Sequence, residues 1–596
     1  MSGPLPIPAT HRRRSTAGPS IALLLALSSA VPAVATEAND LCAPAADPCV
    51  VSQVVLATPN SVIDVGDREL QIIGSGAIEA RAGGLTLRGR RIASGTSARL
   101  RTSGTSRSDP GAPLVIEANE VLLTGEIDVR GSPAGSVDIT ASGAITLAGR
   151  LRGRSESATE SASVVTLSAP TVAVAAIVEL DGGADDSGGD LNVAADTLTV
   201  SGSVIVNGGE GGTVDLSASQ LLVVTAAASI TADATTASSD GGEISLRSDS
   251  VLEIGGRISA NGRNGVVDGG GDGGTISLNG DDRVSVTAAA GVVEARAGAP
   301  DGTGGDIEIL SFFGSIEIRG SVNANGDANE GLGGLLDLAA DTTFDLYGTL
   351  AARGAAAGGG EIDVDAGGSA SIHASGMIDA STTRNAAAGG ILVTAGAVVD
   401  VQGKLFANSA QNTAGTGGSI TLDGCEVAIG AAAELRCRGP RGANTIDAGG
   451  AIVVRGNLSS GPADGVNRLR FPAVGPAPDT TGASIAPAAT HFADPVLSPC
   501  LPAPATSTPT VTATATHTAP SPPTSTPTPT EPVTACPGDC DGNGTVSIAE
   551  LVRAVNIALQ NDTVANCRAA DVNGDGRVTI NELIQAVNSA LQGCLT

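Results

Sequence analysis

The stretch that decides the fold is GGDIEILSFFGSIEIRGSVNANG, residues 304–326. It opens with a glycine pair and continues as three short segments, Ile307-Glu308-Ile309, Ile316-Glu317-Ile318 and Val322-Asn323-Ala324, in which apolar and polar residues alternate. Alternation at period two is typical of half-buried strands. The closing Asn325-Gly326 indicates a turn, because both residue types tolerate positive φ. One such unit therefore predicts three strands joined by tight turns.

The unit recurs from about residue 51 to residue 470. Its glycine pair returns about every 26 to 32 residues, a period typical of solenoids. Other copies of the pair are Gly211-Gly212, Gly241-Gly242, Gly273-Gly274, Gly389-Gly390 and Gly417-Gly418, and Asn261-Gly262 is a second copy of the turn. One set of strands cannot bury its inner face, whereas turns stacked on each other can.

We therefore predict a mainly β fold: a right-handed parallel β-helix over residues 51–470, with about 29 residues and three strands per turn. Roughly fourteen turns at about 4.8 Å each would form a rod on the order of 70 Å long. The alternative is an antiparallel sandwich or a propeller. Propeller blades of about 40 to 45 residues with four strands fit the spacing less well.

The composition agrees with such a rod and excludes some functions. The chain has 596 residues, 81 of them Gly, and only 1% are aromatic. A chain of this kind cannot form a conventional thick core, but it can stack strands with small residues inside. The formal net charge of −29 argues against nucleic acid, which needs a basic footprint. Only four histidines occur, His11, His373, His491 and His517, so a histidine-based catalytic or metal site is not expected.

The N-terminal segment resembles an export signal. Arg12, Arg13 and Arg14 form a basic start, an apolar run follows from Ile21 to Leu27, and Ala33-Val34-Ala35 supplies small residues before Thr36. This order is typical of a signal peptide, here residues 1–35. The apolar run is far shorter than the ~20 residues that cross a bilayer. We expect a bacterial protein without a transmembrane segment after processing, secreted or held at the cell surface, that begins with an N-terminal segment over residues 36–50.

Nine cysteines fit the oxidising environment that export implies. Local disulfides are expected for Cys42 with Cys49 and for Cys425 with Cys437, which leaves Cys500 without an assigned partner. The remaining four, with three possible connectivities, are Cys536, Cys540, Cys567 and Cys594.

A composition change marks the end of the rod. We read residues 471–500 as a cap or transition and residues 501–535, rich in Pro and Thr, as a linker. Proline supplies no amide donor and favours extended polyproline II. The linker is therefore expected to be a semi-rigid spacer that tethers residues 536–596.

Two twelve-residue segments of that tail, 539–550 and 571–582, match the calcium-loop pattern D-x-[DN]-x-[DN]-G-x5-E. Calcium prefers six to eight oxygen ligands, which such a loop supplies from side chains and one backbone carbonyl. The closing glutamate of each loop binds in bidentate fashion, and the glycine at its sixth position permits the sharp turn. We therefore predict two bound Ca²⁺ ions, held by Asp539, Asp541, Asn543, Thr545, Ser547 and Glu550 and by Asp571, Asn573, Asp575, Arg577, Thr579 and Glu582.

A helix is expected after each loop, because apolar residues follow at helical spacing. The two stripes should pack together, with Val546 and Val578 pairing between the loops. The stripes are Leu551, Val552, Val555 and Leu559, and Leu583, Ile584, Val587 and Leu591.

A loop followed by a helix, twice, after a Pro-Thr linker resembles a dockerin, a duplicated EF-hand-type calcium module. The resemblance covers residues 536–596 and implies a cohesin-like partner or a cell-surface scaffold. Two features differ from the family pattern. Dockerin loops usually close with Asp, where this chain has Glu550 and Glu582, and Ile548-Ala549 and Ile580-Asn581 differ from the common choices at positions often used for cohesin contact.

The middle region resembles the β-helical stalks of secreted bacterial adhesins and, more loosely, pectin-lyase-like β-helices. Enzymes on such rods cleave polysaccharides with clustered carboxylates. Asp185-Asp186 and Asp281-Asp282 are the adjacent pairs available, and we read them as solvated turns. We read the aromatic group Phe312-Phe313, Phe344 and Tyr347 as a stack in or on the rod and His373 as exposed, and we assign no catalytic residue.

These expectations combine into one function: an exported, calcium-binding structural or adhesive protein. Its β-helical rod would be attached through the docking module. The alternative is a polysaccharide lyase or glycoside hydrolase that is brought to its substrate by the same module, so a polysaccharide is a second expected partner. An acidic cleft with arginine nearby would favour the enzyme, but no compact group of that kind is evident in the sequence.

Overall fold

The computed structural model describes residues 33–35, 37–81, 83–104, 106, 108–265, 269–287, 291–409, 416–461, 464–497, 500, 537–540, 546, 548–558, 564, 567–572 and 577–592. The internal contacts divide the chain into two units, Met1–Ala503 and Pro504–Thr596. The predicted linker, residues 501–535, lies outside the described residues, as do residues 1–32 of the predicted signal peptide.

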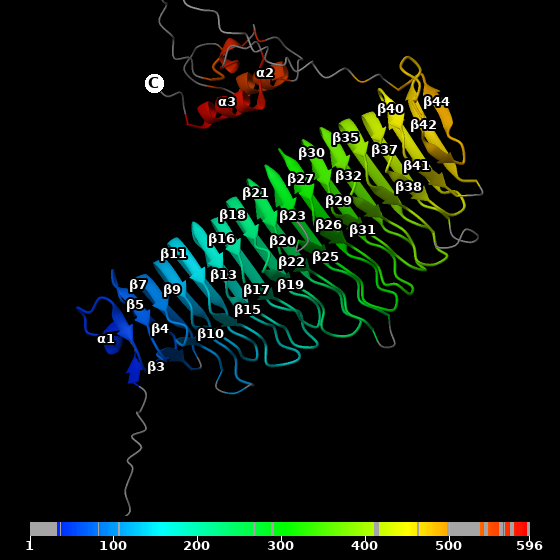
Figure 1. Cartoon of the computed structure of the whole chain (residues 1–596). Helices are drawn as coiled ribbons and strands as arrows, with labels where there is room; N and C mark the ends of the chain where they lie inside the picture. The colour runs from blue at the N-terminus through cyan, green and yellow to red at the C-terminus, as the bar shows by residue number, and fades with distance from the viewer. Residues whose placement is uncertain are drawn as a thin grey trace, which may run out of the picture. The chain divides into compact units, whose positions relative to one another are not determined.

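The first unit is a β-solenoid of about 15 turns (Figure 1). One side is an 18-stranded parallel sheet, named here the short-strand ladder. Its strands, each paired with the next, are β1 (Ala33–Ala35), β3 (Val54–Ala57), β6 (Ala77–Ala80), β8 (Arg99–Arg101), β10 (Glu126–Asp128), β12 (Arg150–Arg152), β15 (Ile177–Glu179), β17 (Ser203–Ile205), β19 (Ser229–Thr231), β22 (Arg257–Ser259), β25 (Val292–Glu294), β28 (Ser321–Asn323), β31 (Thr349–Ala351), β34 (Met377–Asp379), β36 (Lys404–Phe406), β38 (Glu434–Cys437), β41 (Asn457–Ser460) and β43 (Ser484–Ala486).

The other strands of the solenoid form the second ladder. They are β2 (Cys49–Val51), β4 (Ser61–Asp64), β5 (Glu69–Ile72), β7 (Leu85–Ser94), β9 (Leu114–Leu123), β11 (Val137–Leu147), β13 (Val164–Ser168), β14 (Thr171–Val174), β16 (Asp190–Val200), β18 (Thr213–Val224), β20 (Glu243–Ser248), β21 (Val251–Ile254), β23 (Thr275–Gly280), β24 (Arg283–Val286), β26 (Asp306–Ser311), β27 (Ser315–Ile318), β29 (Leu335–Ala340), β30 (Thr343–Leu346), β32 (Glu361–Ala366), β33 (Ser369–Ile372), β35 (Gly390–Val401), β37 (Ser419–Ile429), β39 (Ala443–Ala448), β40 (Ile452–Val454), β42 (Val466–Pro472) and β44 (Thr490–Asp494). Some turns contribute two strands to this ladder, as β20 and β21 do, whereas in others the two run together, as in β18.

Every strand pair in the described part of the solenoid is parallel, so the antiparallel alternative is wrong. The parallel ladders also pass residue 470, the predicted end of the rod, because β43 pairs with β41 and β44 with β42. At the other end, β1 pairs with β3 although it lies within the predicted signal peptide.

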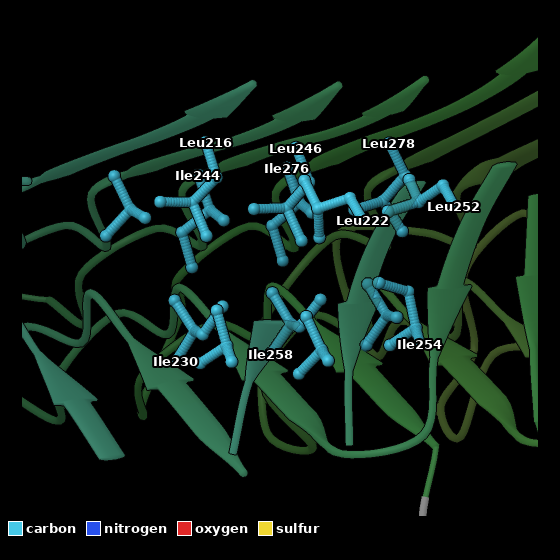
Figure 2. Packing of buried hydrophobic residues seen from close by; sticks show 14 of the residues in the cluster. Leu216, Leu222, Ile230, Ile244, Leu246, Leu252, Ile254, Ile258, Ile276 and Leu278 are labelled. Atoms are coloured by element: carbon cyan, nitrogen blue, oxygen red, sulfur yellow. The ribbon is translucent and has the colours of Figure 1, made fainter. Parts of the chain in front are cut away.

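The core is a set of aliphatic columns that run along the solenoid. Leu216, Leu246 and Leu278 are in register on β18, β20 and β23, and Figure 2 shows them beside Ile244 and Ile276, which continue a parallel column. All five side chains have no exposed surface. The period-two alternation predicts this arrangement correctly, because each strand turns every second side chain into the narrow interior.

The repeated glycine pairs mark a corner where successive turns touch through their backbones. A Cβ atom on Gly274 would lie 2.0 Å from the carbonyl oxygen of Gly242, and one on Gly305 would lie 2.0 Å from the carbonyl oxygen of Gly274. No other residue type fits such a contact, which explains why the pair recurs.

At the corner that follows the short strands, polar side chains accept hydrogen bonds from the backbone of the next turn. Asp233 N donates to Asn207 Oδ1 at 2.8 Å, Asn261 N to Asp233 Oδ1 at 2.7 Å and Arg296 N to Asn261 Oδ1 at 2.8 Å. The expected positive-φ turns at Asn261-Gly262 and Asn325-Gly326 are wrong, because none of these residues has a positive φ. The asparagines instead hold the backbone of the next turn through their side chains.

Three disulfides fall within the described residues: Cys42–Cys49, Cys425–Cys500 and Cys540–Cys567. The first confirms the prediction. The predicted Cys425–Cys437 pair is wrong, because Cys437 is a buried free thiol on the short-strand ladder, whereas half-buried Cys425 lies on the second ladder. Burial raises the pKa of the Cys437 thiol. The third pair occurs in one of the three connectivities of the tail, and Cys536 and Cys594 lie outside the described residues.

The second unit has two described α-helices, α2 (Ile548–Ala558) and α3 (Ile580–Gln592), and a 3₁₀ turn, Arg568–Ala570. The first unit also contains a short α-helix, α1 (Ala38–Leu41), at the start of the solenoid. Among the described residues, no helix is both long and apolar enough to cross a bilayer.

Candidate functional site

The first predicted calcium loop ends on a buried carboxylate. Glu550 is 7% exposed on α2, and its Oε1 accepts a hydrogen bond from Cys540 N at 2.9 Å, near the start of the loop. The predicted ligand Asp539 is also described, whereas Asp541, Asn543, Thr545 and Ser547 lie outside the described residues. The contact shows the closing glutamate turned back toward the loop, as a bidentate ligand would be.

The second loop also ends on a buried carboxylate, but the hydrogen bonds of this carboxylate are local to the junction with α3. Glu582 is 3% exposed on α3, and its Oε2 accepts hydrogen bonds from Thr579 N at 2.8 Å and Thr579 Oγ1 at 2.9 Å. The predicted ligands Asp571 and Arg577 are described, and Asn573 and Asp575 are not. The donors of both loops are all oxygen, and the closing carboxylates are buried at the loop–helix junctions. This set fits a hard cation such as Ca²⁺.

The described part of the tail packs around a small apolar cluster that includes Leu583 of the predicted stripes but neither Val555 nor Val587. Ala554, Ile557 and Ala586 are buried, together with Val546 and Val578. Val555 and Val587, expected on the packed faces, are 43% and 42% exposed, so that part of the prediction is wrong. The side chains of Val552, Leu559, Ile584 and Leu591 lie outside the described part of the chain.

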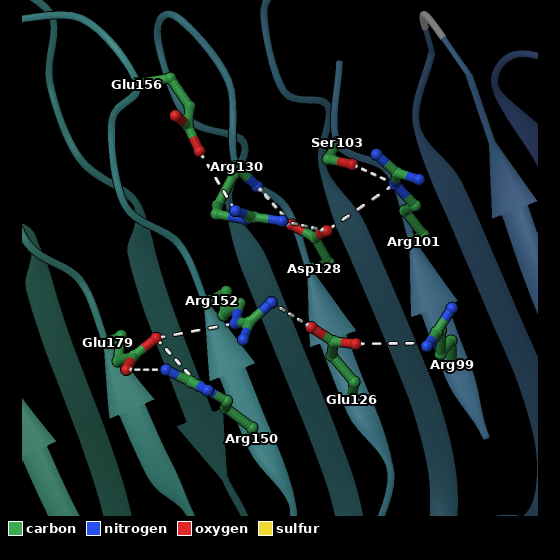
Figure 3. A network of polar contacts seen from close by, with 10 residues as sticks. All are labelled: Arg99, Arg101, Ser103, Glu126, Asp128, Arg130, Arg150, Arg152, Glu156 and Glu179. Atoms are coloured by element: carbon green, nitrogen blue, oxygen red, sulfur yellow. Dashed lines mark hydrogen bonds and ion pairs between the residues drawn. The ribbon is translucent and has the colours of Figure 1, made fainter. Parts of the chain in front are cut away.

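A second candidate site on the solenoid was not evident in the sequence. The outward residues of four successive short strands alternate in charge: Arg99 and Arg101 on β8, Glu126 and Asp128 on β10, Arg150 and Arg152 on β12, and Glu179 on β15. Figure 3 shows two groups of contacts, Glu126 and Glu179 with Arg99, Arg150 and Arg152, and Asp128 with Arg101 and Arg130, which together are named here the charge network. This group was not evident in the sequence, because its members come from four successive turns.

The ion pairs of this charge network run between neighbouring turns. Arg152 Nη1 lies 2.7 Å from Glu126 Oε1, and Arg99 Nε lies 3.5 Å from Glu126 Oε2. Glu179 pairs with Arg150, whose Nε donates at 3.0 Å. The acidic strand β10 thus lies between the basic strands β8 and β12, and ion pairs connect four successive turns from β8 to β15.

Asp128 is the buried carboxylate that pairs with Arg101 and Arg130 in this network. Its Oδ1 and Oδ2 accept from Arg130 Nε and Nη2 at 2.9 and 3.0 Å, and Arg101 Nε lies 3.7 Å from Oδ2. Burial raises the pKa of Asp128, but the hydrogen bonds to Arg130 and the charge of Arg101 outweigh burial, so its pKa lies below the ordinary value. The same hydrogen bond raises the pKa of Arg130. Arg130 is therefore fixed in position by this carboxylate, whereas Arg101 forms a longer ion pair with it and donates to Ser103.

A cavity of about 260 Å³ opens beside this carboxylate. It is lined by Arg101, Ser103, Gly104, Ser106, Arg130, Gly131 and Glu156. Ser103 is 5% exposed and accepts a hydrogen bond from Arg101 Nε, and Arg130 Nη1 donates to Glu156 Oε1 at 3.2 Å. The lining residues come from the corners that follow β8, β10 and β12, one turn after another.

A neighbouring corner contains a carboxyl group whose pKa is raised, in contrast to the lowered pKa of Asp128. Burial and the charge of Glu179 raise the pKa of Asp181 to about 6, against the opposing effect of Arg154. Asp181 lies two residues after β15, in the same corner as Asn207 of the next turn.

The remaining rod residues singled out in the sequence are separate from this cavity. Asp282 is exposed and accepts from Ser250 Oγ at 2.7 Å, and Asp185 is exposed in a loop, so these Asp pairs are turn residues as expected. Phe344 is fully buried, whereas Phe312 and Phe313 are 51% and 67% exposed. His373 is half-buried rather than fully exposed, because its ring stacks on Tyr347 with centroids 3.8 Å apart and its Nε2 lies 2.9 Å from Asp345 Oδ1.

In the comparison with known proteins, the match lies in the C-terminal tail. Residues 537–586 match the family described as Dockerin type I domain. No curated protein and no solved structure matches the chain. The chain thus contains a dockerin type I domain at its C-terminal end and a β-solenoid before it.

Proposed function

We propose that this chain is an exported bacterial protein that displays a β-solenoid rod on a scaffold, through docking of its C-terminal domain to a cohesin-like partner. The match of residues 537–586 to the dockerin type I family carries this proposal. The disulfides Cys42–Cys49 and Cys540–Cys567 support export, because such bonds persist in oxidising compartments.

We propose that docking requires two Ca²⁺ ions, one in each loop. Glu550 and Glu582 would close the two shells, joined by Asp539, Asp571 and the other predicted ligands. A small domain with few buried side chains gains much of its folding free energy from bound metal. Calcium would therefore act by fixing the position of α2 and α3.

The exposed valines mark the proposed docking surface. Val555 and Val587 occupy equivalent positions in the two halves of the domain, and both are more than 40% exposed although apolar. Interface centres are depleted in charge and enriched in apolar contact. Because the domain is duplicated, each half offers a similar surface.

We propose a structural or binding role for the rod, which we infer to wind in the right-handed sense that parallel crossovers favour. A glycoside hydrolase needs two carboxyl groups that flank the scissile bond. In the charge network, Glu126, Asp128 and Glu179 are each paired with arginine. This pairing supports binding rather than hydrolysis at that face.

The direct experiment is capture of the full chain on immobilised cohesin modules. We expect retention with calcium and release with a chelator. Failure of a broad cohesin panel to retain the calcium-loaded protein would contradict the proposal, as would capture that persists in chelator. The alternative enzymatic function is checked by incubating the same protein with pectins and other polysaccharides.

A further inference from the structure

The cavity beside Asp128 lies in a basic region of an acidic protein. Residues 81–154 contain eleven arginines and six acidic residues, whereas the whole chain has a formal net charge of −29. The arginines of the charge network gather on the short-strand ladder, over β8, β10 and β12 (Figure 3). An anionic ligand is therefore attracted to this end of the solenoid and repelled by most of the remaining surface.

The two guanidinium groups of the cavity are preorganised. Asp128 is 7% exposed and forms hydrogen bonds with Arg130 and an ion pair with Arg101, and Arg101 Nε also donates to Ser103, so both side chains are already ordered when a ligand binds. Their side chains remain 40% and 31% exposed, respectively, which leaves donors available toward the cavity. A guanidinium matches the geometry of a carboxylate or sulfate, because two parallel N–H groups can reach two oxygens.

The rest of the lining favours a ligand that also has hydroxyl groups. Ser103 accepts from Arg101 Nε, which leaves its own O–H to donate. Glu156, with a side chain 18% exposed, can accept from a hydroxyl while it contacts Arg130 at 3.2 Å. A site of two arginines with one carboxylate would disfavour a bare polyanion but suits a sugar ring with a single acidic group.

The size of the cavity limits the ligand. At about 260 Å³ it is smaller than the ~300 to 1,000 Å³ typical of pockets for drug-sized molecules. It therefore accommodates about one ring, with the rest of a chain lying on the solenoid surface.

We propose that this cavity binds a carboxylate-bearing sugar residue of an acidic glycan, with Arg101 and Arg130 on the carboxylate and Ser103 and Glu156 on hydroxyls. This ligand class goes beyond the docking function and does not depend on it, because binding here needs neither the dockerin domain nor calcium. The network would then hold the glycan as well as tie the turns together.

The test is calorimetric titration of the full chain, at low ionic strength, with three probes: a galacturonate tetramer, the neutral cellotetraose and a sulfated disaccharide. We expect heat from the galacturonate tetramer and none from cellotetraose. Arg101→Gln should weaken binding at least about tenfold, as expected when a charge-assisted hydrogen bond is lost. Arg88→Gln is the matched control, because Arg88 pairs with Glu117 on the second ladder, outside the cavity.

The variants also separate binding from folding. Arg101→Gln leaves Asp128 paired with Arg130, and Ser103→Ala removes a hydroxyl without removing a charge, so both should keep the thermal unfolding midpoint within a few degrees. Equal binding of galacturonate and cellotetraose, no heat with galacturonate, or unchanged affinity of Arg101→Gln would each overturn the proposal. Tighter binding of the sulfated sugar than of galacturonate would overturn the assignment of the acidic group.

Discussion

The carboxylate of Asp128 receives two parallel hydrogen bonds from the guanidinium of Arg130, at 2.9 and 3.0 Å, in a position where the Asp128 side chain is only 9% exposed. Arg130 lies two residues further along the same turn, just past the end of β10. The pair therefore fixes the corner between the short-strand ladder and the next strand of the second ladder, and it holds one side of the cavity in place.

Replacement of this carboxylate should lower stability in a pH-dependent way. Asp128→Asn leaves Arg130 without its bidentate partner and should reduce the free energy of unfolding at pH 7 by about 1 to 3 kcal/mol. Because the folded-state pKa of Asp128 lies below the unfolded value, its contribution is present above the unfolded pKa and is lost as pH falls through the folded pKa. Denaturant unfolding at pH 7 and pH 3 checks both statements.

The control for this substitution is Asp249→Asn. Asp249 also pairs with an arginine, Arg247, but both side chains are more than half exposed. An exposed pair contributes at most about 1 kcal/mol. A loss as large in the control as in Asp128→Asn, or a difference that persists at pH 3, would contradict the argument.

Replacement of Asp181 should have the opposite effect on stability from replacement of Asp128. The folded-state pKa of Asp181, about 6, exceeds the ordinary 3.8, so its favourable contribution is complete below the ordinary value and is lost as pH rises through 6. Asp181→Asn should therefore stabilise the protein at pH 7.5, by about 1 kcal/mol after allowance for partial solvent exposure, and have little effect at pH 3.5. Thermal unfolding at the two pH values measures the difference, and a variant that is less stable at pH 7.5 would refute this prediction.

Calcium should order the C-terminal domain. In the full chain, chelator should expose α2 and α3 to limited proteolysis and leave the solenoid intact, because the solenoid has its own continuous core. The double variant Asp539→Ala with Asp571→Ala should remain protease-sensitive in calcium and show no calorimetric uptake of two ions. The control Asp249→Ala lies outside both loops. Protection of the double variant by calcium would contradict the proposed ligands.

The two exposed valines should act redundantly in docking. Val555→Asp and Val587→Asp each place a charge on one of two similar surfaces, so either single variant should keep most of its cohesin binding. The double variant should lose at least about tenfold in affinity, since apolar contact is removed from both halves. Val474→Asp, 82% exposed on the solenoid unit, is the control. Loss of binding in one single variant alone would show that only that half docks.

The fold could be predicted from the sequence because both of its signals are local. Alternation at period two is visible within four residues of a strand, as in Ile307-Glu308-Ile309. The glycine pair repeats because a side chain at Gly305 would collide with the backbone of the preceding turn. Short stretches of sequence thus encode both the hydrophobic columns and the close contacts between successive turns of the solenoid.

The charge network could not be found in the same way, because its partners are distant in sequence and adjacent only in the stacked turns. Arg152 and Glu126 are on neighbouring strands, and their contact depends on the register of those strands. The signal was present in the triplets Arg99-Leu100-Arg101, Glu126-Ile127-Asp128 and Arg150-Leu151-Arg152, which alternate in charge. Alignment of successive short strands would have revealed it.

The Cys425–Cys437 prediction and the expected burial of Val555 and Val587 failed for a related reason. Cys425 and Cys437 are close in sequence, but they lie on different ladders, and the actual partner, Cys500, is 75 residues further along the chain from Cys425. In the tail, both valines and alanines fit a helical stripe. Only the packing of the two helices decides that Ala554 and Ala586 are buried and Val555 is exposed.

The glycine corner also determines where such a rod can accommodate changes in loop length. The polar contacts that follow the short strands join residues 26, 28 and 35 positions apart in three successive turns, so the loops that lead to the glycine pairs differ in length while the strands stay in register. These loops can accept insertions, whereas the backbone contact of Gly242 with Gly274 leaves no room for one. The rod can thus acquire new surface loops on one edge without losing its repeat, while its length changes only by whole turns.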